Sequence, residues 1–212
     1  MRPGAKGQAR IVGGQQEVVE QREAALRPLL GDGLIAPDDH LNGLIAKELG
    51  YSDEECENLR KAALLHDIGK IGIPDRILNK PERLTDEEYA IMKSHVEKGA
   101  EILKSFTLVN HVEEGALYHH ERYDGKGYMH GLKGEEIPLN ARIIGIADTF
   151  DAMTANRVYR KKLDKDYVLG EIRRGSGTQF DPKLVDIMLR LIDSGRIDID
   201  NLYKGGEADE DK

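Results

Sequence analysis

Apolar residues recur at helical spacing along most of the chain, and capping or turn residues separate one repeat from the next. Ser52 and Thr85 each precede a glutamate by three residues, which is the capping box that begins a helix. Asp181 followed by Pro182 is a further helix start. The pattern predicts helices at about 16–30, 38–49, 52–66, 85–104, 109–120, 139–158, 164–175 and 181–195. Because the sequence shows neither a convincing strand nor an internal repeat, we expect an all-α fold.

The two ends of the chain differ in composition from the middle. Residues 1–33 are rich in Gly, Gln and Arg around one short helical pattern, which favours a flexible or partly helical extension. Residues 204–212 are acidic and are predicted to form a disordered tail. The 212 residues are 39% hydrophobic and 33% charged, which suits one soluble domain, predicted at 34–203.

Charge and cysteine content narrow the function classes. The formal net charge is −8, so we expect neither a nucleic-acid polymer nor an anionic membrane as a partner. Cys56 is the only cysteine, which leaves no internal disulfide and no thiolate metal site. The sequence has no leader pattern and no apolar run of 18 residues. The expected location is therefore the cytoplasm.

The candidate chemistry begins at His66 and Asp67, which follow the apolar run at 62–65 that carries them into the interior. More side chains of the same kinds come later. The candidate metal ligands are His66, Asp67, His95, His119, His120 and Asp148. Such nitrogen and oxygen donors suit divalent iron, manganese, zinc or nickel, and Asp67 can bridge two ions through its two oxygens. A single buried histidine is usually structural, but this ordered set predicts a two-metal hydrolytic site.

Three motifs, with His95 between the first two, give the chain a family resemblance. It resembles the HD-GYP domain through HDIGKIGIPDRILNKP at 66–81, HHERYDGKGYMHGLKGEEIP at 119–138 and ARIIGIADTFDAMTANRVYR at 141–160. HD-GYP domains belong to the HD superfamily of metal-dependent phosphohydrolases. The resemblance implies an HD-domain helical bundle with a GYP-type C-terminal helical extension. It also implies hydrolysis of cyclic di-GMP to pGpG or GMP. The implied cofactors are two divalent metal ions, with iron or manganese favoured and zinc, nickel or magnesium as alternatives.

The resemblance also implies roles for individual residues. The six candidate ligands take the metal positions, with Asp67 as the bridge. Asp67 and Lys70 are the expected catalytic residues, Lys70 lying near the scissile phosphate. The expected substrate contacts are Lys70, Gly127, Tyr128, Arg157 and Arg160. A protein partner at the 121–137 loop and a homodimer are both compatible with this reading.

The first helix departs from the family pattern. Counted back from Gly50, Leu34 stands where the family has a metal-binding histidine, and Leu30 where some members have a glutamate for a third ion. His40 is the nearest substitute, but six residues of helix shift a side chain by about 9 Å and rotate it by about 240°. We therefore expect the first ion position to lack one ligand and bind weakly, the second to be intact, and a third ion not to bind.

A second departure keeps alternative functions open. Met129 stands where the GYP signature has proline, which frees the backbone after Tyr128. Together with Leu34, it is compatible with a degenerate module that binds cyclic di-GMP or a partner protein without turnover. A broader HD phosphohydrolase acting on another nucleotide is the other alternative, which the Gly127–Tyr128 loop disfavours. The family's catalytic domain is often joined to a sensory or receiver domain, and residues 1–33 are too short for one.

Overall fold

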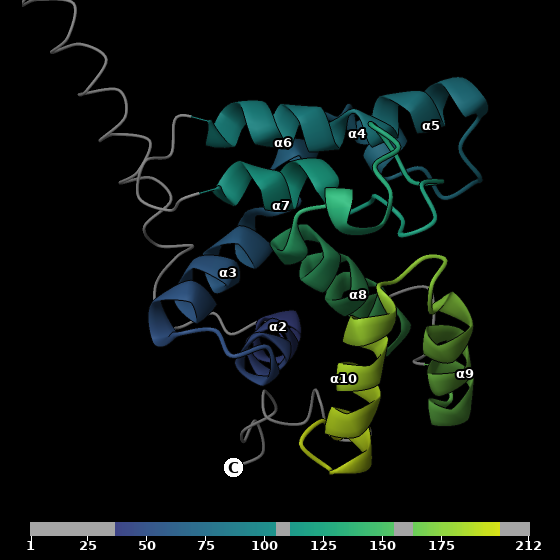
Figure 1. Ribbon diagram of the computed structural model, residues 1–212. Coiled ribbons are helices and arrows are strands. Elements are labelled where there is room, and N and C mark those ends of the chain that lie inside the picture. The colour runs from purple at the N-terminus through teal and green to yellow at the C-terminus, as the bar shows by residue number, and fades with distance from the viewer. Residues whose placement is uncertain (1–36, 105–110, 155–162, 200–212) are drawn as a thin grey trace, which may run out of the picture.

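The structure, a computed structural model, describes residues 37–104, 111–154 and 163–199, with the backbone alone at 37–39. Within these ranges the chain is helical and forms no β-strand, so the all-α prediction is confirmed. The helices are α2 (Pro37–Glu48), α3 (Asp53–Leu65), η1 (Ile68–Gly72), α4 (Asp75–Leu78), α5 (Asp86–Lys93), α6 (His95–Leu103), α7 (Val112–Tyr118), η2 (Gly134–Glu136), α8 (Leu139–Thr154), α9 (Lys165–Gly175) and α10 (Pro182–Asp193) (Figure 1). Among them, no helix is long and apolar enough to cross a membrane.

Helix α8 is the centre of the packing. It contacts α2, α3 and α7 on one side and α9 and α10 on the other, as its diagonal course in Figure 1 shows. Ile143, Ile146 and Phe150 are among its fully buried side chains. The buried residues of α8 meet helices on both of these sides, so α8 lies inside the fold, because each apolar face needs a partner. A Cβ at Gly145 would lie 2.6 Å from the carbonyl oxygen of His119, so the part of α8 that carries Asp148 lies beside the end of α7.

The predicted helix starts are largely confirmed. Ser52 and Thr85 form capping boxes with Glu55 and Glu88, each satisfying backbone N–H groups that the first turn leaves free. The side chain of Asp181 forms the predicted N-terminal cap of α10. Helix α2 begins at Pro37, slightly ahead of the predicted start.

Two predicted helices have different bounds. The helix expected at 85–104 is two helices, because the Ser94 hydroxyl donates to the carbonyl of Ile91 at 2.6 Å and the chain turns there. The helix expected from 109 begins at Val112, because His111 has a positive φ of 57° that an α-helix cannot contain. Helix α4 and the two 3₁₀ helices were not predicted.

Gly69 sets the distance between η1 and α6. A Cβ atom at this position would lie 1.9 Å from the carbonyl oxygen of His95 and 2.4 Å from the backbone nitrogen of Gly99. Only glycine permits so close an approach of two backbones. The contact brings Asp67, which precedes η1, next to the start of α6.

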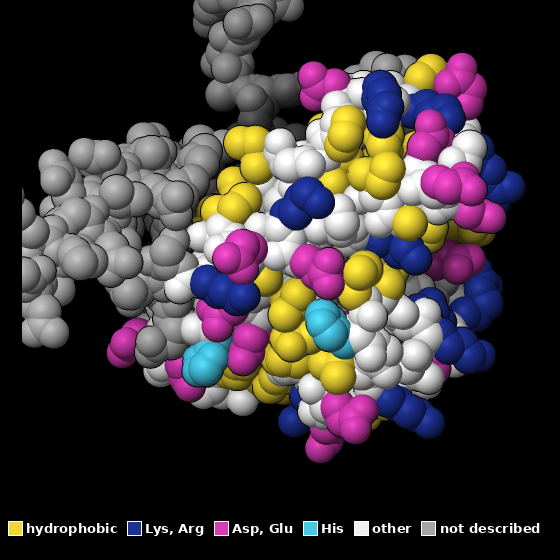
Figure 2. Space-filling view, turned by 90° about the horizontal axis from the view of Figure 1, so that it is seen from above, with side chains coloured by type: hydrophobic (Ala, Val, Ile, Leu, Met, Phe, Trp, Pro, Cys, Tyr) yellow, Lys and Arg dark blue, Asp and Glu magenta, His cyan; other side chains and the backbone are white. Residues whose placement is uncertain are grey.

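The surface above α6 mixes both signs of charge. Figure 2 shows basic and acidic side chains interspersed with apolar ones on this face, with no continuous basic surface among the side chains described. Several predictions lie outside the described residues: the 16–30 helix, the two terminal segments, the last residues of the 139–158 helix, and Leu30, Leu34, Arg157 and Arg160. The domain boundaries stay predictions.

Candidate metal centre

Three histidines are oriented in the same way by their own backbone. In each, Nδ1 hydrogen-bonds a carbonyl three or four residues earlier: His66 to Ala63 at 2.5 Å, His95 to Met92 at 2.8 Å and His119 to Gly115 at 2.9 Å. Because a carbonyl can only accept, Nδ1 carries the proton in all three rings. In the neutral form of each ring, Nε2 therefore keeps its lone pair. A hydrogen bond of this kind fixes the tautomer that a metal ion requires.

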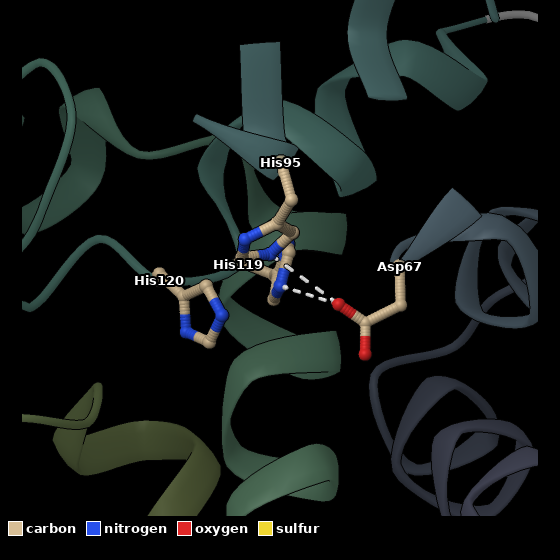
Figure 3. Close-up of side chains that lie close together, drawn as sticks. All are labelled: Asp67, His95, His119 and His120. Carbon is tan, nitrogen blue, oxygen red and sulfur yellow. Dashed lines mark ion pairs between the residues drawn. The ribbon is translucent and has the colours of Figure 1, made fainter. Parts of the chain in front are cut away.

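The Asp67 carboxylate lies between two groups of ligands. Its Oδ1 lies 3.3 Å from Nε2 of His95 and 3.9 Å from Nε2 of His119, and Figure 3 shows these imidazoles approaching it from one side. Its Oδ2 lies 3.4 Å from Nε2 of His66, and this nitrogen lies 3.9 Å from Oδ1 of Asp148. The two oxygens of one carboxylate thus face different partners.

His120 completes the larger of these groups. Asp67, His95, His119 and His120 each offer a ligand atom, and the four atoms lie within 4.8 Å of one another. The structure therefore brings together all six residues that the sequence nominated as metal ligands, in two groups that share Asp67. His40 is exposed on α2 and belongs to neither group.

The buried atoms of this cluster lack hydrogen-bond partners. Within the described part of the chain, none is available to Nε2 of His66, His95 and His119 or to Oδ1 of Asp67. Leaving such atoms buried and unpaired costs about 1–3 kcal/mol each. A cation placed among them would accept every lone pair at once. The donor set therefore fits a divalent metal ion, and the cluster can hold one.

The electrostatics favour a cation as well. Burial opposes ionisation of Asp67, but its contacts with neighbouring histidines outweigh this and hold its pKa well below the ordinary value. Burial and neighbouring imidazoles lower the pKa of His120 to about 4 and that of His119 well below 6.5. Burial would also lower the pKa of His66, yet contact with Asp67 raises it to about 9. Burial raises the pKa of Asp148.

Lys70 follows Asp67 on η1 and forms an ion pair with its Oδ2. The side chain is 40% exposed, so it reaches the cluster from the solvent side. An ammonium here partly neutralises the carboxylate that the metal position needs. The pair therefore places Lys70 at the edge of the candidate centre, and its expected role near the scissile phosphate stays a prediction.

The loop that contains Tyr128 packs directly on the cluster. The Tyr128 and His120 rings lie 4.8 Å apart at an interplanar angle of 31°. Gly127 is required by packing, because a Cβ there would lie 2.4 Å from the backbone nitrogen of Arg122. Both residues border a cavity of about 310 Å³ that also touches His119 and Asp148. The roles of Gly127 and Tyr128 in substrate binding stay predictions.

Glu121 holds this loop in place and was missed by the sequence reasoning. Its Oε1 accepts hydrogen bonds from the backbone N–H groups of His130 at 2.7 Å and Gly131 at 3.1 Å. The residue is only 8% exposed. Its position directly after the two histidines was the available signal. Arg142 and Asp181 also border the cavity and form an ion pair at 2.5 Å, with Asp181 buried, that only the tertiary structure reveals.

Several characterised proteins have sequences similar to this chain. The HD domain family profile matches residues 18–184. The chain is 47% identical over 154 residues to the cyclic di-GMP phosphodiesterase response regulator RpfG of Xanthomonas campestris pv. campestris, covering 71% of this chain and 40% of the relative. It is 42% identical over 147 residues to the 3'3'-cGAMP-specific phosphodiesterase 2 of Vibrio cholerae, covering 68% and 28%. The chain thus spans less than half the length of these relatives.

A solved structure shares the fold. The cyclic GMP-AMP-specific phosphodiesterase V-cGAP3 of V. cholerae superimposes with a TM-score of 0.60 at 23% identity, over 81% of this chain and 45% of that one. The helical HD bundle expected from the motifs is therefore confirmed, as is the resemblance on which it rested. The family profile covers most of the chain and the fold agrees with it, so this protein belongs to the HD domain family.

Proposed function

We propose that this chain is a metal-dependent phosphodiesterase that hydrolyses cyclic di-GMP to pGpG, to GMP or to both. The observation that carries the proposal is the position of Asp67, whose two oxygens face two separate groups of nitrogen and oxygen donors. The name of the Xanthomonas relative supports the choice of substrate. The reaction adds one water across a P–O bond, leaving one oxygen on phosphorus and returning a proton to the departing alkoxide.

Two divalent ions, iron or manganese before zinc, nickel or magnesium, are the proposed cofactors. His66, Asp67 and Asp148 would hold one ion, and Asp67 with the three remaining histidines would hold the other. When bound, such a pair supplies Lewis acidity and a water of lowered pKa. No side-chain nucleophile is then needed.

The protein's own groups complete the site. Asp67 stays ionised because its pKa is lowered, so it presents both oxygens to cations. The Lys70 ammonium, which pairs with Asp67 at the edge of the site, could instead contact the phosphate. There it would stabilise the negative charge that develops during hydrolysis. The loop of Gly127 and Tyr128 would position the dinucleotide. Arg157 and Arg160, outside the described residues, are proposed to meet its phosphates.

The finer assignments belong to the same proposal. We propose the cytoplasm as the location, because Cys56 is the only cysteine, and the family resemblance is compatible with a homodimer and with a protein partner at the 121–137 loop. The homodimer, for example, predicts that the mass of the protein measured in solution is twice that of one chain.

A second candidate substrate is 3'3'-cGAMP, favoured by the name of the Vibrio relative. A third reading, binding without turnover, rests on Leu34 and Met129. The deciding experiment loads the protein with Mn²⁺ or Fe²⁺ and offers cyclic di-GMP, 3'3'-cGAMP and cyclic di-AMP side by side, with products separated by chromatography. We expect pGpG or GMP from cyclic di-GMP. Tight calorimetric binding of cyclic di-GMP without any product would overturn the enzyme proposal.

A further inference from the structure

Gln179 carries the one side-chain amide among the described residues that border the cavity beside the metal centre. It lies in the connection between α9 and α10, and its backbone carbonyl accepts a hydrogen bond from the N–H of Tyr123 at 3.2 Å. The candidate ligands His119, His120 and Asp148 border the same cavity. A phosphodiester held at the metal centre would therefore share its cavity with this amide.

Thr149 determines the orientation of the amide. The Thr149 hydroxyl donates its proton to the carbonyl of Gly145 at 2.8 Å, so its oxygen can only accept a further hydrogen bond. Nε2 of Gln179 supplies that bond, a long one of 3.4 Å. Within the described part of the chain, Oε1 of Gln179 has no hydrogen-bond partner. The amide nitrogen therefore faces Thr149, and the amide oxygen is the group left available to a ligand.

The cavity has the size and the walls that a nucleobase needs. Its volume is about 310 Å³, within the range of about 300–1,000 Å³ for small-molecule sites. Tyr123, Tyr128 and Phe180 border it, and aromatic rings are the surfaces on which bases stack. An oriented amide among such rings adds a hydrogen-bonding group for the edge of the base.

An acceptor with a fixed orientation favours guanine over adenine. Guanine has two adjacent donors, N1–H and N2–H₂, and an amide oxygen has two lone pairs with which to accept them. A freely rotating glutamine amide pairs well with adenine, because it uses its oxygen and its nitrogen together. Here Thr149 engages the nitrogen of Gln179, so adenine would find only the oxygen, with its own N1 acceptor facing it.

We propose that Gln179 recognises a guanine base of the cyclic dinucleotide in this cavity, and that Thr149 is the positioning residue that fixes its amide. The inference rests on the proposed function and deepens it, because it adds a contact that selects the base. The phosphates keep the partners proposed above.

The test compares three compounds on the manganese-loaded protein: cyclic di-GMP, cyclic di-AMP, and bis(p-nitrophenyl) phosphate, which has no nucleobase. The affinity for cyclic di-AMP is measured by competition. Gln179→Met should raise KM for cyclic di-GMP about tenfold, because two guanine donors lose their acceptor. The base-free substrate makes no use of the amide, so its cleavage should stay as in the wild type.

Variants of Thr149 test the positioning role. Thr149→Val frees the amide to rotate and should narrow the preference for cyclic di-GMP over cyclic di-AMP. Thr149→Ser retains the hydroxyl and should retain the preference. Thr178→Val removes an exposed hydroxyl outside the cavity and should match the wild type. A preference that Thr149→Val leaves intact would overturn the positioning role.

The outcomes separate this inference from the proposed function. If Gln179→Met cleaves cyclic di-GMP like the wild type, or if the wild type binds both dinucleotides equally well, base recognition fails and the function stands. If Gln179→Met impairs cyclic di-GMP and the base-free substrate equally, Gln179 supports the metal centre and does not recognise a base. If the wild type cleaves bis(p-nitrophenyl) phosphate but neither cleaves nor binds cyclic dinucleotides, both proposals fail. If it binds cyclic di-GMP without turnover, the calorimetric Kd replaces KM, and the same tenfold weakening is expected.

Discussion

Oδ1 of Asp67 lies 3.3 Å from Nε2 of His95, although the two residues sit on separate helical elements. The other oxygen of the same carboxylate faces His66. One side chain therefore links both groups of candidate ligands, and both groups depend on it. The close approach of η1 to α6 at Gly69 makes this geometry possible.

Asp67→Asn should lower metal content and phosphodiesterase activity together. The amide keeps the shape of the side chain but loses the charge that attracts cations. Activity should fall by more than about a hundredfold, because losing even a partner that orients a ligand costs about 10–100-fold. Elemental analysis and a hydrolysis assay measure the two effects. Asp186→Asn, exposed on α10, is the matched control. Wild-type metal content in Asp67→Asn would contradict the bridging role.

The two ion positions should differ in affinity. We expect protein purified without chelator to hold one ion tightly, because the group around His95 has four donors and the group around His66 lacks one. His66→Ala should then keep the tight ion, whereas His95→Ala should lose it. His40→Ala should change nothing. Two tightly held ions per chain in His40→Ala would show that the first position finds its ligand elsewhere.

Gly69→Ala should destabilise the protein by about 1–3 kcal/mol or more, since the added methyl group overlaps the backbone of α6 and forces it away. Gly43→Ala is the opposite case. Nothing lies within 4 Å of a Cβ there, and alanine in a helix interior should add up to about 1 kcal/mol. Urea unfolding of both variants gives the two signs. Equal effects would mean that η1 and α6 are not in tight contact.

Glu121→Ala should impair catalysis without touching a metal ligand. Two backbone N–H groups lose their acceptor, so the loop of Tyr128 loses its anchor and KM should rise. The loss of stability should be about 1–3 kcal/mol for the unpaired buried groups. Glu121→Gln retains an oxygen that can accept both bonds and should recover most of KM. A glutamine variant as poor as the alanine variant would assign the effect to the charge.

The metal-free protein should be most stable near pH 6.5. Below this value, the unfolded chain takes up protons at His119 and His120 that the folded chain refuses, because their folded pKa values are lowered, that of His120 to about 4. Stability therefore falls as the pH drops from 6.5 toward 4. Above 6.5 the folded chain keeps a proton on His66, whose pKa is raised to about 9, and that contribution is lost as the pH rises through 9.

Chemical denaturation across this pH range tests the prediction. His120→Asn should flatten the acid side of the profile and leave the alkaline side unchanged. His66→Asn should do the reverse. A profile that both variants leave unaltered would assign the pH dependence to groups outside the cluster.

Local signals made much of the fold predictable. The capping boxes at Ser52 and Thr85 lie within four residues of sequence, and a short-range hydrogen bond decides each helix start. The six candidate ligands could also be predicted from the sequence, since their types and order indicate a metal site. What joins them is not local. Asp67 meets His95 through the packing of Gly69, which no periodicity in the sequence reveals.

The errors have equally specific causes. Ser94 lies inside a run of helical apolar spacing, so a continuous helix was predicted there. Its hydroxyl instead donates to the carbonyl of Ile91, in competition with a backbone N–H group, and the chain turns. The Arg142–Asp181 pair and the place of Tyr89 beside Tyr128 depend on contacts between distant segments. Arg157 and Arg160 were nominated by resemblance alone and lie outside the described residues.

The turn at Ser94 also separates a helix that carries a candidate ligand, α6, from one that does not, α5. The ligand His95 begins α6, which is anchored by buried residues, whereas α5 ends just before it and buries no side chain completely. Substitutions in α5, whose Tyr89 borders the cavity, can therefore change the rim of the candidate site while His95 keeps its position. In such a bundle, one short helix with no fully buried side chain can change what the cavity admits, while the candidate metal ligands on the neighbouring elements stay the same.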